Sequence, residues 1–108
     1  MMDNAIKYSR ESVCAGDDYV NRDLTITLPE DSVLEDLIQY LITKRIGNYS
    51  AIPYTGGTAR WALESNIGVL AYVCDDGKRI QYTKWDRQTP LKELGITSIN
   101  GKHTGQWE

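Results

Sequence analysis

Apolar and polar residues alternate over several short stretches of the chain, which is the pattern of half-buried β-strands. The segment 23 to 28 alternates most cleanly, because its leucines and isoleucine fall on one face and its two threonines on the other. Pro29 closes this strand. Looser or less regular patterns predict strands over residues 5 to 13, 59 to 64, 68 to 73 and 79 to 85, and a short final strand over residues 96 to 99.

The segment 33 to 46 has the pattern of an amphipathic helix. Its apolar residues recur at the spacing that places them on one stripe: Leu34, Leu37, Ile38, Leu41 and Ile42. Ser32 and Glu35 are spaced as a capping box, in which each side chain bonds a backbone N–H of the first turn. Gly47 is placed to end the helix in the left-handed conformation.

A second, shorter helix is predicted over residues 89 to 95. Thr89 is a favourable N-cap, Pro90 suits the first helical position, and Gly95 is placed as the stop. The Asp-Gly pair within residues 75 to 78 predicts a hairpin turn between the strands on either side of it.

The resulting order is β-β-α-β-β-β. One amphipathic helix packed on one face of a single, mostly antiparallel sheet of about five strands satisfies this order, which belongs to the α+β class. A hairpin that leads into a helix and then a meander is close to a β-grasp arrangement. Strand order itself is left open by the sequence.

The composition is that of a single soluble domain spanning residues 1 to 108. Hydrophobic residues make up 41% of the chain and charged residues 25%, which is ordinary for a globular protein. No apolar run approaches the ~18 residues of a membrane span, and no signal peptide is recognisable. We therefore expect a cytoplasmic protein with no membrane contact. The formal net charge of −3 argues against nucleic-acid binding, which requires a concentrated basic face.

The two cysteines, Cys14 and Cys74, are predicted to be reduced, because disulfides belong to oxidising compartments. Each is expected to behave as a small buried hydrophobic residue. The two could be neighbours, since each would end a strand. A nucleophilic pair of Cys14 with His103 is disfavoured, because His103 lies in a Gly- and Asn-rich tail that offers no rigid support. No catalytic residue is predicted.

Two acidic pairs are candidates for a metal site. Gly16-Asp17-Asp18 lies between the first two predicted strands, and Asp75-Asp76 begins the hairpin turn. Four carboxylates could bind a divalent cation, but Gly and Asp are also ordinary turn residues, and no ligand follows at an EF-hand spacing. Gly56-Gly57 leads into a strand, whereas a phosphate-binding loop opens a helix. We therefore predict neither a metal nor a cofactor.

The chain has seven Tyr and three Trp but no Phe. Tyr and Trp carry a polar atom that needs a partner, and they are enriched at interfaces. Several are therefore expected to be half-exposed, with Tyr54, Trp61 and Trp107 among the candidates. The alternative places Trp61 and Trp85 in the core. The predicted partner-binding residues are Asp17, Asp18, Tyr19, Asp75 and Asp76, with Tyr54 and Trp61 as secondary contacts.

Several stretches resemble a group of small acidic proteins. These are the string from Val13 to Asp18, the segment "DSVLEDLIQYLI", the Trp-bearing strand "ARWALES" and the strand "GVLAYV". Together they resemble immunity proteins that accompany bacterial polymorphic or contact-dependent toxins. Ala15 departs from the pattern, which has a larger residue such as Met at that position.

The resemblance implies a cytoplasmic protein that neutralises a cognate protein toxin by occluding its active site. A nuclease with a basic groove is one such toxin, and acidic residues around aromatic anchors would suit it. Two other functions remain open. The chain could be an interaction module or homodimer that uses an open sheet edge. It could also be a small metal-dependent hydrolase that uses the Asp pairs.

Overall fold

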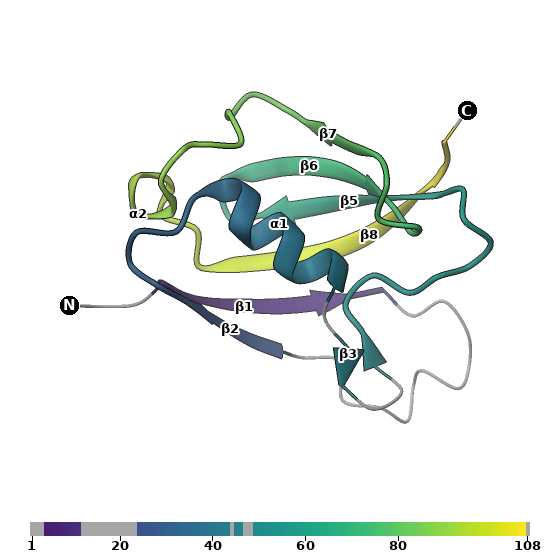
Figure 1. Ribbon diagram of the computed structural model, residues 1–108, viewed down its shortest axis with the longest axis horizontal. Coiled ribbons are helices and arrows are strands. Elements are labelled where there is room, and N and C mark those ends of the chain that lie inside the picture. The colour runs from purple at the N-terminus through teal and green to yellow at the C-terminus, as the bar shows by residue number, and fades with distance from the viewer. Residues whose placement is uncertain (1–3, 12–23, 44, 47–48, 108) are drawn as a thin grey trace.

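The computed structural model describes residues 4–11, 24–43, 45–46 and 49–107 (Figure 1). Its centre is a six-stranded sheet with the order β2-β1-β8-β5-β6-β7. The strands are β1 (Asn4–Arg10), β2 (Leu24–Leu28), β5 (Ala59–Ser65), β6 (Gly68–Cys74), β7 (Ile80–Tyr82) and β8 (Ser98–Gln106). A separate short hairpin pairs β3 (Arg45–Ile46) with β4 (Tyr49–Ser50), and the helices are α1 (Leu34–Thr43) and α2 (Leu91–Leu94).

The sheet is mixed. The pairs β1–β2, β5–β6, β5–β8 and β6–β7 are antiparallel, whereas β1 and β8 are parallel. The chain thus makes a hairpin, crosses one face of the sheet as α1, and returns to insert its last strand beside its first (Figure 1). This is the β-grasp arrangement, so the predicted α+β fold is confirmed, with six strands where about five were expected.

The last strand is the main departure from the prediction. We expected only residues 96 to 99 to be extended and the rest to be a flexible tail, but β8 has nine residues and lies inside the sheet. It pairs with β1 from Lys7↔Ser98 to Arg10↔Gly101 and with β5 from Ser65↔Ile99 to Ala59↔Gln106. The tail prediction was wrong because Gly, Asn and Lys, which make up much of residues 100 to 105, are depleted in strands and so give little strand signal.

The predicted apolar stripe of α1 forms the centre of the core. Leu34, Leu37, Ile38 and Leu41 are fully buried, and Ile42 packs against the core while half-buried. The opposing side chains come from four strands: Ile6, Ile26, Trp61, Leu63 and Leu70. Each such side chain contributes about 1.5–3 kcal/mol on burial, so this contact holds the helix to the sheet.

The predicted capping box at the start of α1 was wrong. The N–H groups of Leu34 and Glu35 donate to the carbonyls of Thr89 and Arg87, at 2.9 Å and 2.8 Å. The segment before α2 therefore satisfies the donors that Ser32 was expected to engage. The side chain that reaches back belongs to Asp36, which accepts from the N–H of Val33 at 2.9 Å.

The short helix begins later than expected. Pro90 is the N-cap of α2, without a side-chain hydrogen bond, in place of Thr89. Gly95 ends the helix with φ 68°, as predicted.

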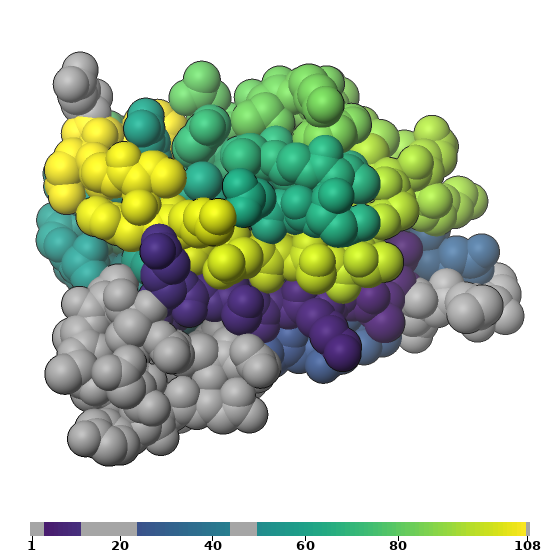
Figure 2. Space-filling view, turned by 180° about the vertical axis from the view of Figure 1, so that it is seen from behind, coloured from purple at the N-terminus to yellow at the C-terminus, as the bar shows by residue number. Residues whose placement is uncertain are grey.

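Neither described helix covers the sheet face opposite α1. Strands β1, β8 and β5 form the middle of the surface seen in Figure 2. The exposed side chains on this face are largely polar, including Lys7 of β1, Thr25 of β2 and Ser98 of β8. Neither described helix is long and apolar enough to cross a bilayer.

Candidate functional site

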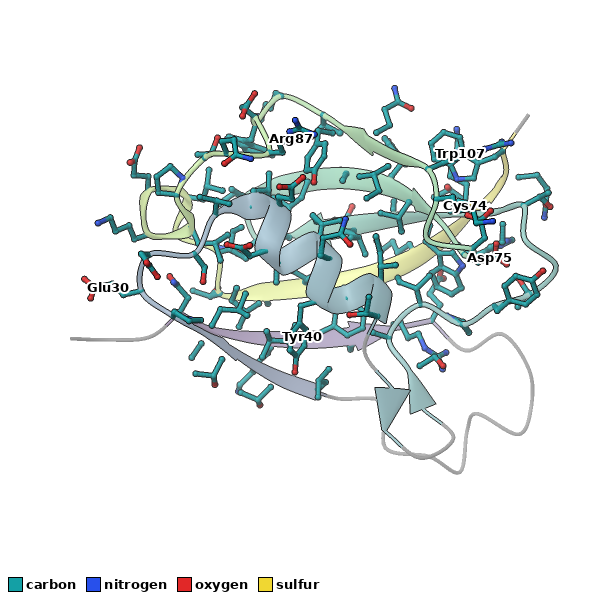
Figure 3. The ribbon with its side chains drawn as sticks, viewed as in Figure 1. Glu30, Tyr40, Cys74, Asp75, Arg87 and Trp107 are labelled. Carbon is teal, nitrogen blue, oxygen red and sulfur yellow. The ribbon has the colours of Figure 1, made fainter. Side chains whose placement is uncertain are left out.

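The loop before β5 is held in place by a buried carboxylate. Asp75, directly after β6, is only 6% exposed (Figure 3). Its Oδ2 accepts hydrogen bonds from the backbone N–H of Thr55 at 2.6 Å, from the N–H of Gly57 at 3.2 Å and from Thr55 Oγ1 at 3.3 Å. Its own N–H donates to Ala59 O at 3.0 Å. One side chain therefore fixes both the turn and the loop of residues 54 to 58.

The ionisation of Asp75 follows from these bonds. Burial alone raises the pKa of this carboxyl group, but the hydrogen bonds from Thr55 and Gly57 more than offset that, so its pKa lies below the ordinary value of 3.8. The group is thus ionised at neutral pH and accepts charge-assisted hydrogen bonds, which are stronger than neutral ones. The loop is held by an electrostatic clamp.

Asp75 is therefore not the exposed acidic contact that the sequence predicted. Its carboxylate is occupied by the loop, so it is unavailable to a partner. Only Asp76 is presented by the turn, and it is half-buried. Asp76 accepts the N–H of Lys78 at 2.8 Å, which lowers its pKa. Gly77 follows with φ 75°, which confirms the predicted turn residue.

Cys74 belongs to the same cluster. Its Sγ is buried and donates to Gly57 O at 3.3 Å and to Asp75 Oδ1 at 3.6 Å. Burial raises the pKa of the thiol, so the thiolate is disfavoured and Cys74 is a poor nucleophile. Cys14 lies outside the described residues, so the expectation that the two cysteines are neighbours stays open.

The clamped loop presents Tyr54. This side chain is 65% exposed and is the only large hydrophobic side chain exposed in the described part of the chain. A Cβ added at Gly57 would lie 3.0 Å from the Tyr54 hydroxyl, so the ring folds back over that glycine. Gly57 has φ 88°, a backbone conformation that favours glycine, and the nearby Tyr54 ring leaves little room for a side chain at this position. Tyr54 is an aromatic side chain held at the surface by a rigid support.

Trp107 flanks the loop from the end of β8. Its backbone N–H donates to Thr58 O at 2.7 Å, and the residue is half-buried. Figure 3 places it at the same end of the sheet as Cys74 and Asp75. Its indole Nε1 has no hydrogen-bond partner among the described residues. The sequence named Trp107 as an aromatic candidate, but only the pairing of β8 brings it beside the loop.

Trp61 is a correction to the predicted binding residues. It is 0% exposed, and its ring meets the edge of His103 with the centroids 5.5 Å apart. Because β5 places it on the face under α1, it serves as core and cannot contact a partner. The core alternative is right for Trp61, while Trp85 is half-buried with Lys84 Nζ 4.7 Å from its ring centroid.

Asp17, Asp18 and Tyr19 lie outside the described residues, so the structure gives them no position. Of the seven predicted binding residues, the structure therefore brings three to one end of the sheet: Tyr54, Asp75 and Asp76. Among these, Tyr54 and Asp76 reach the surface.

A depression of about 650 Å³ lies where β1, β2 and β8 meet the turn after β5. Its polar lining includes Lys7, Ser9, Glu64, Asn66, Ser98 and Asn100. Within the described ranges, no three His, Cys, Asp or Glu side chains are grouped so that they could hold a metal ion. The lining therefore offers hydrogen bonds but no evident constellation for catalysis.

Comparison with protein-family models, with curated proteins and with solved structures gave no match in any of the three cases. Function is therefore inferred from geometry.

Proposed function

We propose that this chain is a non-catalytic protein-binding domain that neutralises a bacterial protein toxin by covering its active site. One observation carries the proposal: the buried, ionised Asp75 holds the loop by hydrogen bonds, and Tyr54 is exposed on that loop. Tyrosine is enriched among residues that dominate binding energy. A loop already fixed in the free protein loses little entropy on binding, which raises affinity.

The charge of the chain supports the same partner. The net charge is −3, and Asp76 lies in the turn next to the clamped loop. Acidic groups around an aromatic anchor favour approach to a basic surface, such as the substrate groove of a nuclease. The proposed mechanism is steric and electrostatic occlusion, which requires no catalytic side chain on this chain.

The test is co-expression with the product of the neighbouring reading frame. If that product is toxic, we expect this chain to restore growth and to form a complex that is isolated as a unit. Tyr54→Ala should weaken the complex by roughly tenfold or more, since truncating an aromatic anchor costs about 2–4 kcal/mol. Tyr54→Phe, which keeps the ring, is the matched control and should bind nearly as well. Equal affinity of Tyr54→Ala and the parent protein would exclude this loop as the contact.

The segment that contains Asp17 and Asp18 is tested separately, because it lies outside the described residues. Asp17→Lys combined with Asp18→Lys reverses its charge. If protection and affinity are unchanged, this segment is not part of the contact surface. If no neighbouring product is toxic, or if this chain fails to protect against it, the toxin-neutralising function itself is wrong.

A further inference from the structure

Strand β2 forms an open edge of the sheet described by the structure. It is the outermost strand on one side, and β1 is its only neighbour among the described strands. Natural proteins usually protect edge strands with charges, proline, bulges or short length. The opposite edge, β7, has three residues and is flanked by Lys78, Arg79 and Lys84. Strand β2 is longer, with five residues, and has neither a charge nor a proline within it, while Asp23 and Pro29 adjoin its two ends.

The register shows which backbone groups of β2 face outward. Lys7 N donates to Thr97 O at 3.0 Å and Glu11 N donates to Gly101 O at 2.9 Å, so the odd-numbered residues of β1 bond β8. Lys7 is opposite Thr25 and Ala5 is opposite Thr27, and both are therefore non-hydrogen-bonded pairs. The N–H and C=O groups of Thr25 and Thr27 point away from β1.

These four outward groups have no partner among the described residues. The next outward position is Pro29, which has no N–H, and its carbonyl already accepts from Ser32 N at 3.0 Å and Asn4 Nδ2 at 2.9 Å. The open edge described by the structure is therefore limited to two residues, Thr25 and Thr27.

The sequence of this edge is self-complementary. Residues 24 to 28 read Leu-Thr-Ile-Thr-Leu, which is the same in both directions. When two such strands pair antiparallel about Ile26, each residue meets a residue of its own kind. Thr–Thr pairs are favourable cross-strand neighbours, and the absence of charge removes like-charge repulsion.

We propose that β2 pairs with β2 of a second copy of this chain about a two-fold axis at Ile26. In this register Thr25 faces Thr27 of the other copy, and the two Thr pairs exchange four hydrogen bonds that satisfy all four outward groups. The two sheets become continuous, and the two-fold axis keeps both copies of α1 on one face. Leu24 and Leu28, which are half-buried at the edge, gain cover from their counterparts. This inference is independent of the toxin-neutralising function.

The contact is small, so the dimer is expected to be weak. Stable interfaces bury about 1,200–2,000 Å², which is more than a five-residue strand pair supplies. We therefore expect dimerisation to depend on concentration and to be visible by sedimentation over a range from about 1 µM to about 1 mM.

The first test uses Thr27→Pro. Proline is tolerated on an edge strand where the N–H faces solvent, so the monomer should fold as before. It removes one outward donor from each copy and places its ring in the path of the partner. The dissociation constant should rise by about tenfold or more. Thr27→Val keeps the N–H and the branched side chain, and it should dimerise like the parent chain.

The second test fixes the register and does not depend on the proline variant. Thr25→Cys and Thr27→Cys chains are prepared separately with tags of different size and then mixed and oxidised. Opposed residues have Cα atoms about 5.5 Å apart, within disulfide range. The yield of disulfide-linked dimer should be higher in the mixture than in either chain oxidised alone. This is expected because position 25 of one copy faces position 27 of the other.

Three results would overturn the proposal. These are a wild-type chain that stays monomeric at every concentration, a Thr27→Pro variant that dimerises as well as the parent, and a mixture that cross-links no better than its components. If the parent chain is strictly monomeric and Thr27→Pro loses toxin binding, the β2 edge pairs with a strand of the toxin instead.

Discussion

The Oδ2 atom of Asp75 lies 2.6 Å from the backbone nitrogen of Thr55, twenty positions earlier in the chain. This contact joins the β6–β7 turn to the loop that carries Tyr54. The sequence predicts that Asp75 is exposed, but the residue is buried and supports the loop from inside. The consequences can be measured in stability, in pH dependence and in thiol reactivity.

Replacing the carboxylate should destabilise the fold. Asp75→Ala leaves the N–H groups of Thr55 and Gly57 without their acceptor, and we expect the free energy of unfolding to fall by about 2–3 kcal/mol. Urea unfolding monitored by tryptophan fluorescence measures this. Asp31→Ala is the matched control, since Asp31 is exposed and has no side-chain hydrogen bond with described residues, and its effect should stay within about 0.5 kcal/mol. Equal losses in the two variants would contradict the clamp.

Acid should release the same clamp. The pKa of Asp75 is lowered in the folded state, so the unfolded chain binds the proton more readily. The stabilisation is therefore present above the ordinary value of 3.8 and is lost as pH falls from that value through the lower folded pKa. The stability difference between the parent and Asp75→Asn, measured by urea unfolding at decreasing pH, should shrink over this window. If the stability difference does not change with pH, ionisation of Asp75 does not contribute to the free energy of unfolding.

The buried hydroxyl of Tyr8 should couple to Gly101. Tyr8 is 1% exposed and its hydroxyl donates to Ala51 O at 2.5 Å, while a Cβ at Gly101 would lie 2.5 Å from the same hydroxyl. Gly101→Ala should therefore cost about 1–3 kcal/mol of stability. In a Tyr8→Phe background the hydroxyl is gone, and the cost should be smaller. A double-mutant cycle by chemical unfolding measures the coupling, and strict additivity would rule out this contact.

Cys74 should resist alkylation in the native state. Burial raises its pKa and hides the sulfur, so reaction with a thiol reagent requires opening of the loop or of the whole fold. In a Cys14→Ser variant, which leaves a single thiol, labelling should be slow in buffer and fast in denaturant. Asp75→Ala in the same background should accelerate native labelling, because the loop over Cys74 is released. Fast labelling of the native single-thiol chain would contradict the buried site.

The C-terminal segment should exchange slowly as part of the sheet. Between Ile99 and Gly105, β8 pairs with β5 on one side and with β1 over its first part on the other. Amide hydrogen exchange should protect residues 99 to 103 as strongly as the centre of β5. A flexible tail, as the composition suggested, would instead exchange within the dead time. Amides of the exposed loop 54 to 58 that do not bond Asp75 should exchange fast and serve as the reference.

Local patterns were reliable where burial is one-sided and continuous. The stripe of α1 and the alternation of β2 follow directly from periodicity, because each presents one apolar face to one core. The Asp-Gly turn and the Gly95 stop follow from positive φ. The capping box failed because the Glu35 N–H that Ser32 would cap bonds the distant carbonyl of Arg87, which a local motif cannot anticipate. The Ser32 N–H that Glu35 would cap bonds Pro29 O.

The candidate site was less accessible from the sequence. Tyr54 was identified as a surface aromatic, but Asp75 and Trp61 were placed outside when both point inward. An Asp in a turn has the same sequence signal whether its carboxylate meets water or backbone N–H groups. Trp61 was ambiguous because its strand has apolar residues on both faces.

By itself, the sequence determined the number and type of most elements, the α+β class and the self-complementary residue order of β2, because these depend on residues close together in the chain. That β2 lies at the edge of the sheet was decided by the tertiary structure. The tertiary structure decided that a Gly-rich tail becomes the central strand β8 and that Asp75 holds a loop twenty residues away. The reason is physical: β8 is stabilised mainly by the strands beside it, and the ionised state of Asp75 by the donors that surround it. Both sets of partners become neighbours only when the sheet closes.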